Sequence, residues 1–121
     1  MVVGKHVWVF ADGDLPPHPD GAGDPVAHEA LMVVNAGEND AQIRVSLLFE
    51  EHPPRDGLEI SVPARRVRCF RMDQKIWGDD YQIPFGQYAL VLESDQPVVA
   101  VFGRLDRREN VAYYSVAPYS A

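Results

Sequence analysis

Acid–base and hydrogen-bonding side chains occur where two apolar runs begin and end. His28 and Glu29 open one run directly after a long polar segment, and Arg104 and Asp106 follow the end of another. A histidine beside a carboxylate can act as an acid–base or hydrogen-bonding pair at the mouth of a pocket. An arginine at the end of a buried run needs a carboxylate or an anion as its partner. One interpretation is a pocket for a sugar or a small anionic metabolite, built from Trp8, His28, Glu29, Arg66, Arg104 and Asp106.

Both pairs also have a structural interpretation. Adjacent residues of a strand point to opposite faces, so His28 and Glu29 act on one ligand only if the strand begins at Ala30. Otherwise His28 bonds to the preceding loop and Glu29 is solvated or paired. Positions 104 and 106 share a face, so Arg104 and Asp106 can instead form an ion pair at a strand end or a subunit contact.

A cluster of arginines forms the other candidate site. Arg65, Arg66, Arg68 and Arg71 lie within the stretch SVPARRVRCFR, in a chain whose formal net charge is -7. Pro63 is expected to start a strand, because proline lacks the N–H that an interior strand position donates. Alternation then places Arg65 and Arg71 on one face and Arg66 and Arg68 on the other. One set can therefore line a pocket or a subunit contact while the other faces solvent.

The arginine cluster leaves three interpretations open. It can protect a sheet edge, since charge on both faces of a strand discourages edge-to-edge pairing. It can bind a protein or a small anion. It can also contact DNA phosphates, with binding that weakens steeply with salt, although the acidic balance of the chain is untypical of a nucleic-acid binder. We expect Arg65 and Arg66 to be the structural or ligand-facing pair, and Arg68 and Arg71 the more replaceable pair.

The motifs of the common enzyme classes are absent from the sequence. It has no Gly-x-Ser-x-Gly, no phosphate-binding loop ending in Gly-Lys-Ser/Thr and no dinucleotide-binding glycine pattern. The four histidines form neither His-x-His nor His-Glu-x-x-His, and the stretch from Asp12 to Asp14 lacks the glycine and glutamate positions of a calcium loop. We therefore expect a protein that is not an enzyme and that holds no metal ion or cofactor.

The elements that must position these residues are strands. Odd-numbered positions of 41–49 are apolar and most even-numbered ones are polar, and 58–62 repeats the alternation, which indicates strands with one buried face. Shorter apolar runs suit strands buried on both faces, inside a sandwich or an oligomer. These runs cover residues 7–10, 30–34, 88–92, 98–102 and 111–114. Turn-forming residues recur mostly at intervals of about 8–15 residues, which is typical of an all-β sandwich or barrel.

The chain of 121 residues has the length of one domain, and its hydrophobic fraction of 46% is ordinary for a globular protein. The single Cys69 cannot form an intrachain disulfide, which fits a reducing compartment. No stretch approaches the roughly 20 apolar residues that span a bilayer, and the N-terminal residues lack a signal-peptide pattern. We therefore expect a cytoplasmic protein without membrane insertion. Residues 11–27 and 72–86 are expected to be long loops, either functional or mobile.

Several short segments together resemble the sensory rhodopsin transducer family, first known from Anabaena. They follow the family's order and spacing over nearly the whole chain, and the most specific are Val62-Pro63-Ala64-Arg65-Arg66 and Arg104-Leu105-Asp106. The other segments are Leu15-Pro16-Pro17, His28-Glu29, Val34-Asn35-Ala36-Gly37, Asp40-Ala41, Ile83-Pro84 and Gln96-Pro97-Val98-Val99. The chain departs from the family pattern over residues 72–82.

The resemblance implies an all-β, jelly-roll-like β-sandwich, a single domain over residues 1–121 that assembles into a homotetramer. It further implies a soluble, non-enzymatic signalling module whose partner is a membrane photoreceptor, a sensory rhodopsin, or another signalling protein. The family fold is also similar to carbohydrate-binding modules, and direct DNA binding has been proposed for the best-known member. A carbohydrate- or metabolite-binding protein and a DNA-binding regulator therefore stay open as alternatives. The resemblance implies no catalytic residues.

Overall fold

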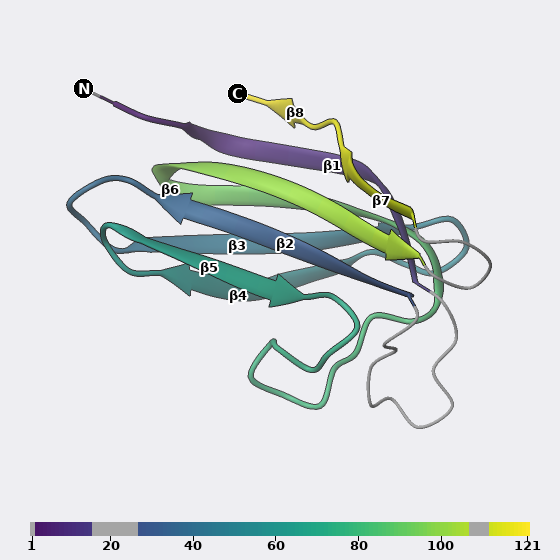
Figure 1. Ribbon diagram of the computed structural model, residues 1–121. Helices are drawn as coiled ribbons and strands as arrows, with labels where there is room; N and C mark the ends of the chain where they lie inside the picture. Colours follow the sequence, from purple (N-terminus) through teal and green to yellow (C-terminus); the bar gives the residue numbers. More distant parts are fainter. Residues whose placement is uncertain (1, 16–26, 107–111) are drawn as a thin grey trace.

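The computed structural model describes residues 2–15, 27–106 and 112–121, and the side chains of Ala27, Asp106 and residues 112–115 lie outside that description. The described residues form strands and connecting segments (Figure 1). The strands are β1 (Lys5–Leu15), β2 (Ala27–Asn35), β3 (Ala41–Phe49), β4 (Arg55–Val62), β5 (Arg66–Arg71), β6 (Gly86–Asp106), β7 (Ala112–Val116) and β8 (Tyr119–Ser120). Within these described ranges, no helix is long and apolar enough to cross a membrane.

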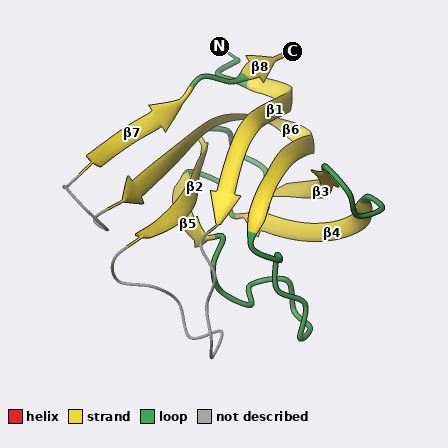
Figure 2. Cartoon of the chain, turned by 90° about the vertical axis from the view of Figure 1, so that its right-hand side faces the viewer, coloured by secondary structure: helices red, strands yellow, loops and turns green. Residues whose placement is uncertain are grey.

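The strands pair in antiparallel fashion into two sheets that share β6. Sheet A has the strand order β4-β3-β6-β1-β8, and sheet B has the order β5-β2-β6-β7. The first half of β6 pairs with β1 and β3, and residues 99–106 pair with β2. The two layers are therefore joined along one long, bent strand, which Figure 2 shows passing from one layer to the other. This architecture confirms the predicted all-β, jelly-roll-like sandwich.

Side-chain alternation decides which face of each strand is buried. In β3 the odd-numbered residues up to Leu47 are fully buried, as the sequence predicted. Four aromatic rings run through the interior between the layers. Trp8 stacks on Phe10 with 6.3 Å between ring centroids, and the Phe102 ring lies 5.8 Å from Phe10 and 6.5 Å from Tyr88. Each buried side chain of this size contributes about 1.5–3 kcal/mol, so this row is a main source of cohesion between the sheets.

The arginine-rich stretch contains a turn between two strands, and the prediction that Pro63 starts one strand through it is wrong. β4 ends at Val62 and β5 begins only at Arg66. Between them Arg65 has a φ of 57°, in the left-handed region that strands exclude. The backbone N–H of Arg65 donates to the carbonyl oxygen of Gly37 at 3.2 Å, which fixes the turn against the β2–β3 connection. The alternation of arginines therefore starts anew at Arg66.

The two long loops predicted from composition have different outcomes. The prediction for residues 11–27 is wrong at both ends. Residues 11–15 continue β1 and pair with β6 after a bulge between Phe10 and Gly13, and Ala27 begins β2. Residues 16–26 lie outside the described residues. Residues 72–85 form an irregular connection between β5 and β6, as predicted.

Candidate functional site

The predicted acid–base pair lies inside β2, because that strand begins before it. β2 starts at Ala27 and pairs with β6 from there on, so His28 and Glu29 point to opposite faces of sheet B. Glu29 points inward and has only 1% of its surface exposed. His28 is half-buried on the other face. Joint action on one ligand required a strand that begins at Ala30, and β2 begins three residues earlier, at Ala27.

Glu29 is the centre of a buried hydrogen-bond cluster built from three strands. Its Oε1 accepts from the Tyr88 hydroxyl at 2.8 Å, and its Oε2 accepts from Arg104 Nε at 2.8 Å. The backbone N–H of Asp14 donates to both carboxylate oxygens at 3.0 Å. Arg104, whose side chain is 14% exposed, also donates through Nη2 to Asp12 O at 2.9 Å and to Asp12 Oδ1 at 3.2 Å. This Glu29 cluster joins β1, β2 and β6.

Burial and hydrogen bonding act on the Glu29 cluster in opposite directions. Burial raises the pKa of Glu29, and the bonds from Asp14 N–H, Arg104 and Tyr88 counteract this rise without cancelling it. Burial also raises the pKa of Tyr88 well above its ordinary value, and the adjacent Glu29 carboxylate adds to the rise. Tyr88 therefore stays a protonated donor at neutral pH. Since both oxygens of Glu29 already accept bonds from the fold, the cluster holds strands together more readily than it serves a ligand.

Gly13 makes room for the Tyr88 ring against β1. A Cβ atom at Gly13 would lie 2.5–2.7 Å from ring atoms of Tyr88, closer than nonbonded carbon atoms approach. The missing side chain lets the ring lie against the backbone and brings its hydroxyl to Glu29. In the sequence, Asp12 and Asp14 are noticeable only as an incomplete calcium loop, so their part in the cluster was missed. The available signal was a glycine within a strand, which often marks close approach by another group.

The other residues of the predicted pocket are dispersed. Trp8 belongs to the core, where its Nε1 donates to a backbone carbonyl of β6 at 3.0 Å. Arg66 pairs with the last residue of β2, six positions along that strand from Glu29, a separation of roughly 20 Å. The predicted partner of Arg104, the side chain of Asp106, lies outside the described residues. The structure thus brings Glu29 and Arg104 together but leaves Trp8 and Arg66 apart from them.

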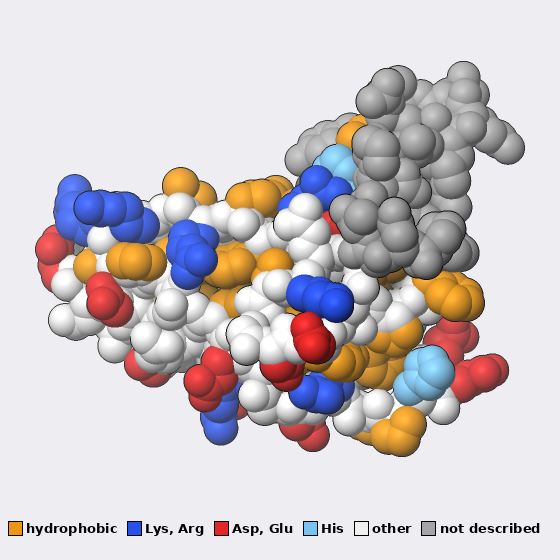
Figure 3. Space-filling view, turned by 90° about the horizontal axis from the view of Figure 1, so that it is seen from below, with side chains coloured by type: hydrophobic (Ala, Val, Ile, Leu, Met, Phe, Trp, Pro, Cys, Tyr) orange, Lys and Arg blue, Asp and Glu red, His pale blue; other side chains and the backbone are white. Residues whose placement is uncertain are grey.

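Arg65 and Arg66 are exposed at the turn between β4 and β5. Arg65 Nη1 lies 3.1 Å from Glu38 Oε1 in a largely exposed ion pair, and such pairs contribute about 0–1 kcal/mol. Arg66 Nη1 donates to the carbonyl oxygen of Arg65 at 3.0 Å. Figure 3 shows basic side chains spread along this side of the molecule with acidic ones between them. The pair expected to be structural or ligand-facing therefore makes surface contacts in this chain.

Arg68 and Arg71 make the better-defined contacts, contrary to the expectation that they are the replaceable pair. Arg68 Nη1 donates to Ser61 O at 2.7 Å and its guanidinium lies 5.0 Å from the Phe70 ring centroid, so it links β5 to β4. Arg71 donates through Nε and Nη2 to the two carboxylate oxygens of Asp73 at 2.7 and 2.6 Å. Asp73 is fully buried, and its hydrogen bonds raise the pKa of Arg71 above the ordinary value.

A contiguous apolar surface lies on the outer side of sheet B, beside the row that holds Arg71. It consists of two cross-strand rows, Val67–Val34–Val99 and Cys69–Met32–Val101. Val67, Val34 and Val101 are 63%, 39% and 46% exposed, and Cys69 is exposed beside them. Monomeric proteins rarely expose contiguous apolar patches of this kind without an interaction that covers them. We call this surface the sheet B face.

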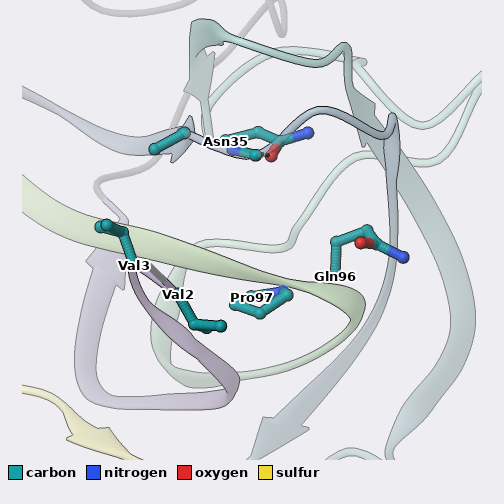
Figure 4. A pocket seen from close by; sticks show the side chains of 7 residues that line it. Val2, Val3, Asn35, Gln96 and Pro97 are labelled. Carbon is teal, nitrogen blue, oxygen red and sulfur yellow. Dashed lines mark hydrogen bonds between the residues drawn. The ribbon is translucent and has the colours of Figure 1, made fainter.

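A small cavity of about 180 Å³ lies where the N-terminal segment meets the bend of β6 (Figure 4). It is lined by Val2, Val3, Asn35, Ala36, Gly37, Gln96 and Pro97. The Asn35 amide is satisfied by backbone groups: Nδ2 donates to Asn39 O at 2.7 Å and Val62 O at 3.0 Å, and Oδ1 accepts from Gly37 N–H at 3.0 Å. Asn35 therefore shapes the turn, and Gln96 is the polar side chain that a ligand could reach. In the part of the chain that is described, no three histidine, cysteine or acidic side chains gather to hold a metal ion.

Comparison with known proteins gives a family and several similar solved structures. The sequence model of the family described as Anabaena sensory rhodopsin transducer matches residues 3–120. The crystal structure of Thermotoga maritima 1070 is similar, with a TM-score of 0.78, 28% sequence identity and coverage of 98% of this chain and 96% of that chain. The structure of the Anabaena sensory rhodopsin transducer has a TM-score of 0.70 and 27% identity, and the match covers 84% of this chain and 90% of that chain. No curated protein matches significantly.

Proposed function

Because the chain belongs to the Anabaena sensory rhodopsin transducer family, we propose that it is a non-enzymatic binding and signalling module that acts as a homotetramer in the cytoplasm. Its partner is a membrane photoreceptor of the sensory rhodopsin type or another signalling protein. The name of the similar Anabaena structure describes that protein as a sensory rhodopsin transducer. For this chain, the observation that carries the proposal is the sheet B face.

The sheet B face supports assembly because it is apolar where a monomer normally presents polar side chains. An antiparallel sheet with one face in water alternates apolar and polar residues. The outer side of sheet A does so, with Arg44 between Glu59 and Glu93 in one cross-strand row. The two rows of the sheet B face carry no charge, and Arg71 lies in the next row on that side. Covering apolar surface stabilises an assembly by about 25 cal/mol per Å², so this face favours a protein neighbour over water.

The other functions considered from the sequence have less support. A general acid or base must reach the proton that it transfers, whereas Glu29 is buried and accepts bonds from Tyr88 and Arg104. A sugar or metabolite pocket would need Trp8 and Arg66 to converge with the Glu29 cluster, which they do not. DNA binding is disfavoured by the formal net charge of -7 and by the acidic Glu38 beside Arg65, because both oppose the approach of phosphates.

Sedimentation velocity at micromolar concentration tests the assembly. The wild-type chain is expected to sediment as a tetramer of the 13.5 kDa subunit. Val67→Glu places a charge in the sheet B face and should dissociate the tetramer, whereas Val2→Glu, at a 78% exposed position outside the face, should not. A monomeric wild type would contradict the homotetramer. A tetramer that survives Val67→Glu would contradict the role of this face.

Binding to a reconstituted photoreceptor tests the partner. A sensory rhodopsin in lipid nanodiscs is immobilised, and binding of the tetramer is measured in the dark and under illumination. Binding that differs between the two conditions is expected of a signalling partner. Absence of binding in both conditions would exclude that rhodopsin as the partner while leaving the assembly result intact.

A further inference from the structure

An exposed aromatic ring and two carboxylates occur together at the end of sheet A away from the arginine-rich turn. A hollow of about 170 Å³ lies there, between the β3–β4 connection and the start of β6. It is lined by Phe49, Glu50, Glu51, His52, Phe85 and Gln87. Figure 3 shows hydrophobic, histidine and acidic side chains gathered at one end of the molecule. We call these six residues the Phe85 patch.

The backbone holds Phe85 away from the core. Ile83 fills the nearby core position and is 3% exposed, and Gly86, with a φ of 103°, turns the chain into β6. Phe85 lies between them and is 69% exposed. Phe49 packs against the edge of the core and meets the His52 ring edge-on, with 5.7 Å between the centroids. The patch therefore presents aromatic surface that the fold does not use.

The carboxylates of the Phe85 patch are acceptors only, whereas His52 and Gln87 carry both N–H donors and acceptors. Glu50 and Glu51 are exposed, and neither forms a hydrogen bond or an ion pair with any described residue. Gln87 Nε2 donates to Ala11 O at 3.2 Å, so the side-chain carbonyl oxygen of Gln87 is the group that remains to accept. The hollow has no lysine or arginine in its lining. A ligand that complements the patch must bring donors, positive charge and a surface that packs on an aromatic ring.

We propose that the Phe85 patch docks an arginine side chain carried by a segment of a protein partner. A guanidinium is planar, permanently charged and has five N–H donors, so it can stack on a ring and donate to carboxylates at once. The chain already contains such an arrangement within itself. Arg55 lies 4.3 Å from the ring centroid of Tyr81, and its Nη2 is 3.4 Å from Asp79 Oδ2. At the Phe85 patch the ring and the carboxylates are present and the cation comes from the partner.

The charge of the patch selects among classes of partner. Glu50 and Glu51 repel the phosphates of nucleic acids and of anionic lipids, which have the same sign of charge. A lysine ammonium is a compact, strongly hydrated point charge, so it gains less from the ring than a guanidinium does. The inference rests on one part of the proposed function, the binding of a protein partner. It requires neither the tetramer nor a photoreceptor.

Fluorescence anisotropy with a fluorescein-labelled arginine-rich peptide tests the inference on the full-length chain. The wild type is expected to bind this peptide, to bind a lysine version more weakly, and to lose affinity for both as the salt concentration rises. Phe85→Ala should weaken arginine-peptide binding about fivefold through loss of an exposed cation–π contact. The combined Glu50→Gln and Glu51→Gln variant should weaken it by about the same factor.

Two matched variants separate the patch from general surface effects. Tyr119→Ala removes an aromatic side chain of similar exposure, 63%, and Glu59→Gln removes a carboxylate from the outer side of sheet A; neither should change peptide affinity. Equal losses for Tyr119→Ala and Phe85→Ala, or a wild type that does not bind the peptide, would overturn the inference. Circular dichroism and sedimentation of Phe85→Ala should match the wild type. The assembly proposal is tested by a different experiment, the sedimentation of the wild type and of Val67→Glu, so the two proposals can fail independently.

Discussion

Replacing Arg71 by alanine is expected to destabilise the fold far more than the same change at Arg66, although both arginines lie in one short basic stretch. Arg71 donates twice to Asp73, whose surface is 0% exposed. Removing one partner of a buried ion pair costs about 3–5 kcal/mol, because the other charge stays buried without its counter-ion. Since 30% of the Arg71 side chain is exposed, water can replace part of the contact. We therefore expect a loss of about 2–4 kcal/mol for Arg71→Ala.

Arg66 provides the matched control. Its guanidinium contacts an exposed backbone carbonyl, so Arg66→Ala should change stability by less than about 0.5 kcal/mol. Urea denaturation followed by tryptophan fluorescence, at one fixed protein concentration, measures both variants. Adding Asp73→Asn to Arg71→Ala should recover part of the loss, because the buried carboxylate that has lost its arginine counter-ion is then neutral. Equal destabilisation by the two single variants, or strictly additive losses in the double variant, would refute the reasoning.

Three other sites give measurable outcomes. Gly13→Ala, whose Cβ would lie 2.5 Å from the Tyr88 ring, should lower stability by about 1–3 kcal/mol in urea denaturation, whereas Gly37→Ala, with 3.4 Å to its nearest neighbour, should be close to neutral. The Cys69 thiol should react slowly with a maleimide in the wild type and quickly in Val67→Glu, because the proposed assembly covers the sheet B face. The pKa of Tyr88 is raised well above 10.0, so its contribution to stability is present below pH 10 and is lost as the pH rises further. Tyr88→Phe should lessen that alkaline loss and cost about 1 kcal/mol at neutral pH through the missing hydrogen bond.

Each of these outcomes has a contrary result. Equal stability of the Gly13 and Gly37 variants would show that the Tyr88 ring moves aside at no cost. Equal maleimide rates in assembled and dissociated chains would place Cys69 outside the interface. An unchanged alkaline stability profile in Tyr88→Phe would mean that other groups govern the loss at high pH.

Local alternation was sufficient to predict strands, because the face that a residue presents depends on its immediate neighbours. The pattern over residues 41–49 became β3 with its odd-numbered residues inside. The turn at Arg65 was not accessible in the same way, because arginine is an ordinary strand residue. Its φ of 57° is tied to a hydrogen bond with Gly37, which lies on a different connection. A local sequence pattern does not predict contacts between segments that lie far apart in the chain.

For the candidate site, the sequence likewise indicated individual residues but not which of them contact each other. Glu29 and Arg104 were recognisable from residue type, and the structure places them in contact at 2.8 Å. Their pairing depends on the register of β2 against β6, which joins positions 75 apart in the chain. Tyr88 was missed because it sits in an apolar run typical of the core. Asp14 was missed because it acts through its backbone N–H, which every residue other than proline possesses.

Three of the segments that carry the family resemblance, over residues 34–37, 62–66 and 96–99, meet at one corner of the fold. Asn35 Nδ2 donates to Val62 O at 3.0 Å, and the backbone N–H of Arg65 donates to Gly37 O at 3.2 Å. These bonds tie the β2–β3 turn to the β4–β5 turn, and the shared residues Gln96 and Pro97 line the cavity beside them. The shared residues of this corner therefore hold the two turns together and help to join the two sheets.

The two proposed interaction surfaces differ in their relation to those shared segments. Val34 and Val99 of the sheet B face belong to them, so self-assembly through this face is expected to accompany the family fold. The residues of the Phe85 patch belong to none of them, so recognition of an arginine-bearing partner is expected to be particular to this chain. A family member with apolar residues at the positions of Val34 and Val99 but without Phe85, Glu50 and Glu51 should form the same tetramer and fail to bind the arginine-rich peptide. If such a protein bound the peptide, the Phe85 patch would not be the site that recognises arginine.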